Sequence, residues 1–191
     1  DNTEELSRAR IQYGTSLFYP ATVMGSHVSA TPNHQTRNIT PIKFRFDMAC
    51  AGRLGMELQP KQMDDEEKAF ARRAIESYKG YRDIIMEGDL YRIGTPYDDT
   101  GYYGVMYVSK DKKKAVLFTY CTHYQSRTLV PKFRLYGLDA QTRYRIEEQN
   151  VDKKRFWFDG GTFTGEYLTH AGVNPNLCKI YDSAVFVLEA E

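Results

Sequence analysis

The side chains in this chain that could do acid–base chemistry are carboxylic acids spread along its length. A carboxyl group can act as a nucleophile or can give and take a proton, provided that the fold holds it beside a second reacting group. The sequence alone identifies no catalytic pair among these acids, so we expect each to be a solvated surface group. The acids considered are Asp47, Glu57, Asp98, Asp99 and Glu166.

Histidines are the next candidates, because imidazole binds metals and transfers protons. The four histidines, at positions 27, 34, 123 and 170, match no metal-binding spacing, and no cluster of Cys or carboxylates accompanies them. His27 lies in an apolar stretch and His34 in the loop sequence TPNHQ, and for both we expect structural hydrogen bonds. The chain has no GxGxxG, P-loop or GxSxG motif. We therefore expect no metal and no cofactor.

The thiols and the aromatic runs have simple structural interpretations. Cys50, Cys121 and Cys178 are odd in number and widely spaced, so we expect free thiols that are buried or partly buried. The runs 102–103 and 156–158, the latter with the single Trp157, could stack on sugar rings. At strand spacing, however, we expect such runs to be half core and half surface.

Composition excludes several classes of partner. The net charge is +1, from 26 basic and 25 acidic residues in short mixed runs, which argues against nucleic acid and against a charged membrane surface. No apolar run approaches the about 20 residues of a membrane span. The N-terminus has no basic start and no apolar stretch, so we predict no signal peptide. Because the sequence also lacks an initiator Met, we expect a processed product or a fragment. The compartment, cytoplasmic or secreted, stays open.

The elements that must position these side chains begin with a helix. Asn2, with Glu5 three residues later, predicts a helix start, and apolar residues at helical spacing continue until Pro20 prevents a further turn. A short apolar stretch over 22–29 then predicts a buried strand.

Two further helices are predicted before residue 88. After a loop over 31–35, Thr40 and its following proline begin a helix that runs to about Gly52. The clearest helix begins near Asp64, with Glu67 three residues later, and Gly88 is its natural end. The first half is therefore expected to be mostly helical, with one strand.

After Gly88 the hydrophobic period changes from that of a helix to that of a strand. Several short strands separated by turns over about a hundred residues predict an antiparallel β-sandwich. The expected strands are Tyr102–Val108, Lys114–Cys121, Phe133–Tyr136, Tyr144–Glu147 and Ala184–Leu188.

Several motifs, in order and spacing, resemble those of glycoside hydrolase family 36, the family of bacterial α-galactosidases and their eukaryotic relatives. The resemblance covers essentially the whole chain and is most specific in its first half. The motifs are DNTEE at residues 1–5, IQYGTSLFYP at 11–20, GSHVS at 25–29, PNHQT at 32–36, GRLGMEL at 52–58 and GDLYR at 88–92. Weaker matches are GLD at 137–139, YRI at 144–146 and GEYL at 165–168.

The resemblance implies an α+β fold of two parts. Residues 1–88 would be the last βα elements of a TIM barrel, and residues 89–191 a C-terminal antiparallel β-sandwich domain. On this template, residues 2–20 resemble the helix after barrel strand seven, residues 22–29 resemble strand eight, and residues 40–88 resemble the closing helical segment.

The resemblance also implies a function and one catalytic residue. Asp1, followed by Asn2 and Thr3, is similar to the family's general acid/base motif, whereas the nucleophile's Lys-Trp-Asp motif is absent. The implied parent is a retaining α-galactosidase that acts on galactose-containing oligosaccharides. The resemblance also implies a homo-oligomer, and the isolated chain is expected to be inactive.

Two alternatives stay open. The chain could be a non-catalytic carbohydrate-binding or structural β-sandwich module, with Trp157 as its first binding residue. The parent could also act on α-N-acetylgalactosamine or transfer galactose between sugars.

Overall fold

The structure, a computed structural model, describes residues 2–124 and 130–191, so Asp1 lies outside the described residues. No helix within these ranges is both long and apolar enough to cross a bilayer. The helices are α1 (Glu5–Thr15), α2 (Ile42–Cys50), α3 (Asp65–Glu87) and α4 (Gly165–His170), with 3-10 turns at Ala21–Val23 and Pro60–Gln62. The strands are β1 (Gly25–Ser29), β2 (Arg53–Glu57), β3 (Asp89–Gly94), β4 (Tyr102–Val108), β5 (Lys114–Cys121), β6 (Arg143–Gln149), β7 (Thr162–Thr164) and β8 (Asp182–Ala190).

Two predicted helix starts have different outcomes. Asp64 caps α3, because its carboxylate accepts the backbone N–H of Glu67 at 2.8 Å, as predicted. For α1 the predicted Asn2 cap is wrong. Glu4 is the N-cap, and its side chain accepts from the Ser7 N–H at 2.7 Å, while the Asn2 side chain accepts from the Glu4 N–H.

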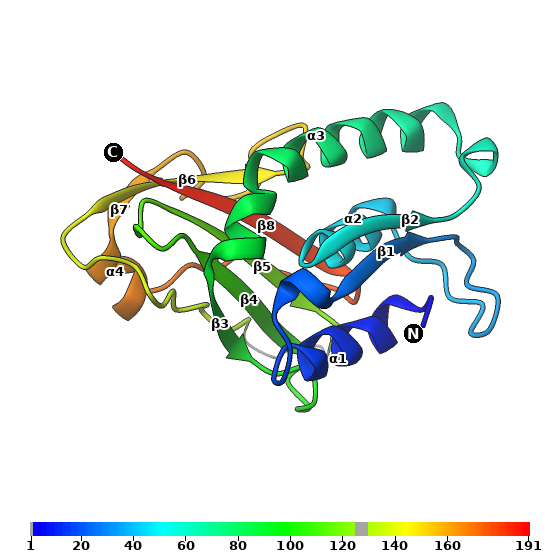
Figure 1. Cartoon of the computed structure of the whole chain (residues 1–191), viewed down its shortest axis with the longest axis horizontal. Helices are drawn as coiled ribbons and strands as arrows, with labels where there is room; N and C mark the ends of the chain where they lie inside the picture. The colour runs from blue at the N-terminus through cyan, green and yellow to red at the C-terminus, as the bar shows by residue number, and fades with distance from the viewer. Residues whose placement is uncertain (1, 125–129) are drawn as a thin grey trace.

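The first half contains a parallel β-α-β unit (Figure 1). Strands β1 and β2 pair in parallel from Gly25↔Arg53 to Ser29↔Glu57, and α2 connects them. The expectation of one strand in the first half is therefore wrong, and the closing helical segment that the resemblance implies over residues 40–88 contains a strand, β2. The segment that forms β2 is short and contains a glycine, and it pairs with residues that lie 28 positions earlier in the sequence. For these reasons local hydrophobic spacing did not predict this strand.

The second half is a six-stranded antiparallel sheet with the order β3-β4-β5-β8-β6-β7. The bounds of β4 and β5 are those predicted, and β6 and β8 contain the strands predicted over 144–147 and 184–188. The predicted strand at 133–136 is wrong. Phe133 makes only an isolated bridge with Val173, and the Leu135 N–H donates to the Leu168 carbonyl instead of to a neighbouring strand.

Strands β4 and β5 of this sheet are buried on both faces, whereas β6 exposes alternate residues. One face carries Tyr103, Val105 and Phe118 and packs on α2 and α3, while the other carries Met106 and Leu117 and packs on the loops around α4. The run 102–103, expected to be half surface, is therefore wholly buried, because alternate side chains enter opposite cores.

Helix α2 lies between the β1–β2 pair and the large sheet (Figure 1), and sheet tyrosines bind its last turns. The Tyr120 hydroxyl donates to the Asp47 carbonyl at 2.8 Å, and the Tyr107 hydroxyl donates to the Ala51 carbonyl at 2.9 Å. The last carbonyls of a helix lack partners within the helix. The sheet supplies two of these partners, and so helps to fix the helix that connects β1 to β2.

Candidate functional site

The segment that follows Asp1 lies against the loop that follows β1. The Asn33 side chain donates to the Thr3 hydroxyl at 3.1 Å, and the Asn38 side chain donates to the Glu4 carboxylate at 3.3 Å. His34, exposed in the same loop, has its Nδ1 atom 3.5 Å from the Thr3 hydroxyl. The predicted hydrogen bond of His34 is thus a long one. These contacts place residues 2–4 beside the chain as it leaves the carboxyl end of β1.

Local hydrogen bonds build this loop. The Asn33 carboxamide oxygen accepts the N–H groups of Gln35 and Thr36 at 2.9 and 3.0 Å, which makes a turn around a buried side chain. At the loop's start, Arg45 of α2 donates to the Ser29 carbonyl at 3.0 Å and to the Glu67 carboxylate at 2.6 Å. Helices α2 and α3 therefore position the loop that meets residues 2–4.

A polar cluster lies where α1 meets the β1–β2 pair. The His27 Nε2 atom is 2.7 Å from the Glu57 carboxylate. The Nη1 atom of Arg8, on α1, lies 3.1 Å from the same Nε2 atom. Arg8 also donates to the Asn2 carbonyl at 2.9 Å. Burial is the main cause that lowers the pKa of His27, and the positive charge of Arg8 lowers it further. The Glu57 carboxylate raises this pKa, but by less. The structural hydrogen bonding predicted for His27 is confirmed, and sequence reasoning missed Arg8, which is buried on a helix of mixed polarity.

Asp47 was predicted to be a solvated surface acid, and this is wrong. Its side chain is fully buried. One oxygen accepts from Lys43 at 2.5 Å and from the Ser183 hydroxyl at 2.8 Å, and the other accepts from the Asn150 side chain at 2.9 Å. Because these partners come from α2, β8 and the loop after β6, Asp47 joins the two halves of the chain and has no access to a substrate.

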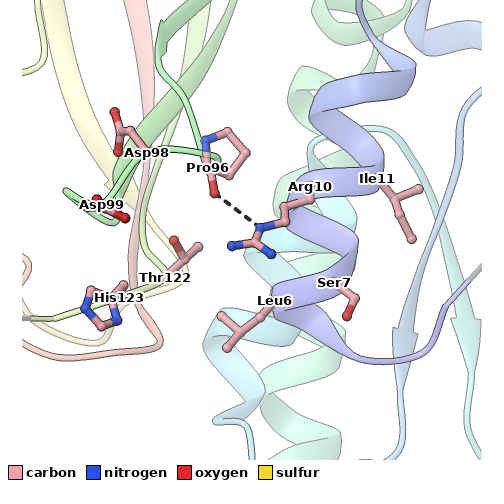
Figure 2. Close-up of a pocket in the computed structure, with 9 residues that line it drawn as sticks. All are labelled: Leu6, Ser7, Arg10, Ile11, Pro96, Asp98, Asp99, Thr122 and His123. Carbon is pink, nitrogen blue, oxygen red and sulfur yellow. Dashed lines mark hydrogen bonds between the residues drawn. The ribbon is translucent and has the colours of Figure 1, made fainter.

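A hollow between α1 and two loops of the large sheet brings together Asp98, Asp99 and His123 (Figure 2). Both acids are exposed, as predicted. Arg10 crosses from α1 toward the loop, where its Nε donates to the Pro96 carbonyl at 3.4 Å. The Asp98 carboxylate accepts from the backbone and hydroxyl of the nearby Thr100, so it shapes its own turn. These features assign the loop a structural role.

The remaining predicted groups lie apart from these clusters. Glu166 is exposed in the first turn of α4, as predicted, and Glu57 is exposed although it pairs with His27. Cys50 and Cys121 are buried free thiols, and burial raises the pKa of Cys121 to about 11. The prediction for Cys178 is wrong, because this thiol is exposed. Within the described ranges no three His, Cys, Asp or Glu side chains are arranged to hold a metal.

Two family models match the chain. Residues 1–88 match the model described as Melibiase, and residues 102–188 match the Glycosyl hydrolase family 36 C-terminal domain. A bifunctional alpha-galactosidase/sucrose kinase from Mediterraneibacter gnavus is 39% identical over 97% of this chain and 19% of its own length. Alpha-galactosidase 2 from Hypocrea jecorina is 34% identical over 100% of this chain and 24% of its own length.

Solved structures agree in fold over the whole chain. The galactosidase domain of an alpha-galactosidase-sucrose kinase superposes with a TM-score of 0.88 at 36% identity, covering 100% of this chain and 25% of that one. A GH36 alpha-galactosidase from Geobacillus stearothermophilus gives 0.89 at 32% identity, with the same coverage. The chain thus spans about a quarter of these solved relatives. From the two family models and these relatives together, the chain belongs to glycoside hydrolase family 36.

Proposed function

We propose that this chain is the C-terminal part of a retaining α-galactosidase that hydrolyses terminal α-linked galactose from oligosaccharides. The observation that carries the proposal is the position of residues 2–4, which are bound through Asn33 and Asn38 to the loop after β1. Barrel enzymes build their active sites from loops at the carboxyl ends of the strands. The residue that precedes this segment, Asp1, would then belong to the catalytic face.

In this proposal residues 1–88 close a catalytic barrel and residues 89–191 form its C-terminal domain. Strands β1 and β2, each followed by a helix, would be two neighbouring βα units. With β2 as the eighth strand, β1 is the seventh, and Asp1 follows the sixth. This differs by one strand from the placement that the resemblance implies, because the sequence pattern did not reveal β2.

Asp1 would act as the general acid/base. It would protonate the departing glycosidic oxygen and later take a proton from the attacking water, while a nucleophilic carboxylate about 5–5.5 Å away forms the glycosyl-enzyme. That nucleophile would lie in the part of the polypeptide before Asp1. The chain alone would then hold one member of the pair and would be inactive.

The proposed substrates are galactose-containing oligosaccharides. Two Geobacillus stearothermophilus alpha-galactosidase structures similar to this chain are complexes with raffinose and with stachyose. A homo-oligomeric parent is part of the same proposal, and light scattering of the full-length protein tests it.

Activity measurements on both polypeptides test the function. We expect the full-length protein to hydrolyse an aryl α-galactoside, and NMR should show the α-anomer of galactose as the first product. The isolated chain should hydrolyse it no faster than the uncatalysed background. Asp1→Asn in the full-length protein should lower the rate by about 10²–10⁴-fold. A full-length sequence without a Lys-Trp-Asp segment before Asp1, or an isolated chain whose turnover Asp1→Asn abolishes, would refute the proposal.

A further inference from the structure

Trp157 is a largely exposed aromatic side chain, second in exposure only to Phe18 among the aromatic rings of the described residues. It is the single tryptophan of the chain, and it is 77% exposed although large aromatic rings are usually mostly buried. It lies in the turn between β6 and β7, and not in a strand as its aromatic neighbours suggested. A single exposed apolar side chain is common on protein surfaces, so a binding role for Trp157 depends on the neighbouring rings with which it forms a continuous surface.

Other aromatic rings hold the indole in one orientation. Its ring meets the buried Phe158 and the β7 residue Phe163 edge to face, each with centroids 5.8 Å apart at 88°. Phe163 in turn stacks on Tyr167 of α4 at 5.3 Å. Both contacts are edge to face, an arrangement that favours this orientation of the indole, and a ring that is already oriented loses less entropy when a ligand binds.

The size of this surface favours a small ligand over a protein. Trp157 is 77% and Tyr167 is 42% exposed. With about 150–250 Å² for each aromatic side chain, the two present about 180–300 Å². A stable protein complex buries about 800 Å² on each partner. One or two pyranose rings, by contrast, fit this area, and their C–H faces stack on aromatic rings while their hydroxyls stay in water.

Polar groups surround the rings. The Lys154 ammonium lies on the same turn, where it donates to the Asp159 carbonyl at 3.1 Å, and the Tyr167 phenol is exposed beside Phe163. We propose that Trp157 and Tyr167 form a binding surface for a hexopyranose ring of a neutral oligosaccharide, separate from the segment next to Asp1.

The two places are far apart in the fold. Trp157 packs on β7, the last strand of the sheet order, whereas α1 meets the opposite edge strand, β3, through a Tyr13 hydroxyl that donates to the Gly94 carbonyl at 3.1 Å. A sugar held at Trp157 would therefore be bound without being cleaved, as in an auxiliary site that keeps a polymeric or clustered substrate near the enzyme. The proposal is independent of whether the chain has catalytic activity.

Because Trp157 is the single tryptophan, its fluorescence reports on this surface directly. We expect raffinose and stachyose to shift its emission saturably, with a Kd on the order of 1 mM, and sorbitol at equal molarity to leave it unchanged. Saturation-transfer NMR of raffinose then compares variants. Trp157→Ala should weaken binding at least about tenfold, and Tyr167→Ala should weaken it less. Tyr136→Ala, which removes a similarly exposed tyrosine elsewhere, should not change it.

Three outcomes would overturn the proposal. The first is an emission spectrum that both sugars leave unchanged up to about 50 mM, well above the expected Kd. The second is a Trp157→Ala variant with undiminished saturation transfer. The third is emission that changes with protein concentration alone while sedimentation shows dimers, which would make this surface a contact between copies of the chain.

Discussion

Replacing Asp47 with alanine should destabilise the chain more than any surface change, because Asp47 is a fully buried carboxylate with three partners. The substitution leaves Lys43, Asn150 and Ser183 without their acceptor. Hydrogen bonds to a charged group contribute about 1.5–3 kcal/mol each, but the sum overstates the loss because the carboxylate no longer has to be desolvated. Removing one partner of a buried ion pair costs about 3–5 kcal/mol, and we expect Asp47→Ala to fall in that range.

Urea unfolding measures this loss. With a slope of about 2.5 kcal/mol/M, a loss of about 4 kcal/mol moves the midpoint down by about 1.5 M. Asp47→Asn keeps the shape but replaces one acceptor oxygen with an N–H₂ donor and removes the negative charge beside Lys43, so it should cost less than alanine and more than a surface change. Adding Lys43→Met should then recover about 1 kcal/mol or more, because the unpaired cation is removed. A midpoint shift below about 0.3 M for Asp47→Ala, under 1 kcal/mol at this slope, would refute the reasoning.

Two smaller predictions concern single contacts. Asp64→Ala removes the α3 cap and should lower the free energy of unfolding in urea by about 1 kcal/mol. Asp65→Ala is the control, because Asp65 lies in the same turn but is fully solvated and makes no capping bond, and it should cost clearly less. Equal losses would argue against capping. In the folded chain the pKa of His27 is lowered below its ordinary value of 6.5. As the pH falls, the unfolded chain therefore binds a proton at His27 before the folded chain does. The stability that neutral His27 contributes is present above pH 6.5 and is lost as the pH falls toward the lower folded pKa. His27→Gln should therefore flatten the dependence of unfolding free energy on pH in that window, and an unchanged slope would contradict the assignment.

The sequence predicted best where one local signal decides the structure. The bounds of β4 and β5 were predicted because apolar residues flank a charged turn, and the end of α3 because a glycine follows its last turn. The strand expected at 133–136 was wrong because alternation alone does not supply a partner, and the Leu135 N–H finds one in the loop near Leu168.

Properties that depend on distant segments were not predictable. Strand β2 becomes a strand by pairing in parallel with β1, and Asp47 is buried because the large sheet covers α2. The burial of Asp47 depends on Ser183, which is 136 residues away in sequence. In the candidate site, the motif beside Asp1 and the PNHQ loop were both identified from sequence, but their contact through Asn33 and Thr3 was not. The role of Asp1 itself stays a prediction.

These contacts suggest why the sheet half accompanies the half that carries the candidate site. Helix α2 connects β1 to β2, and through Arg45 it also holds the start of the loop that meets residues 2–4. The same helix is bound to the sheet by Tyr120, Tyr107 and the partners of Asp47. A shift of α2 on the sheet would therefore move the loop beside Asp1. On this reasoning the sheet half supports the candidate site by fixing α2. Under the proposed function, a variant that weakens the Asp47 contacts should lower the catalytic rate of the full-length protein, although the Asp47 side chain is fully buried.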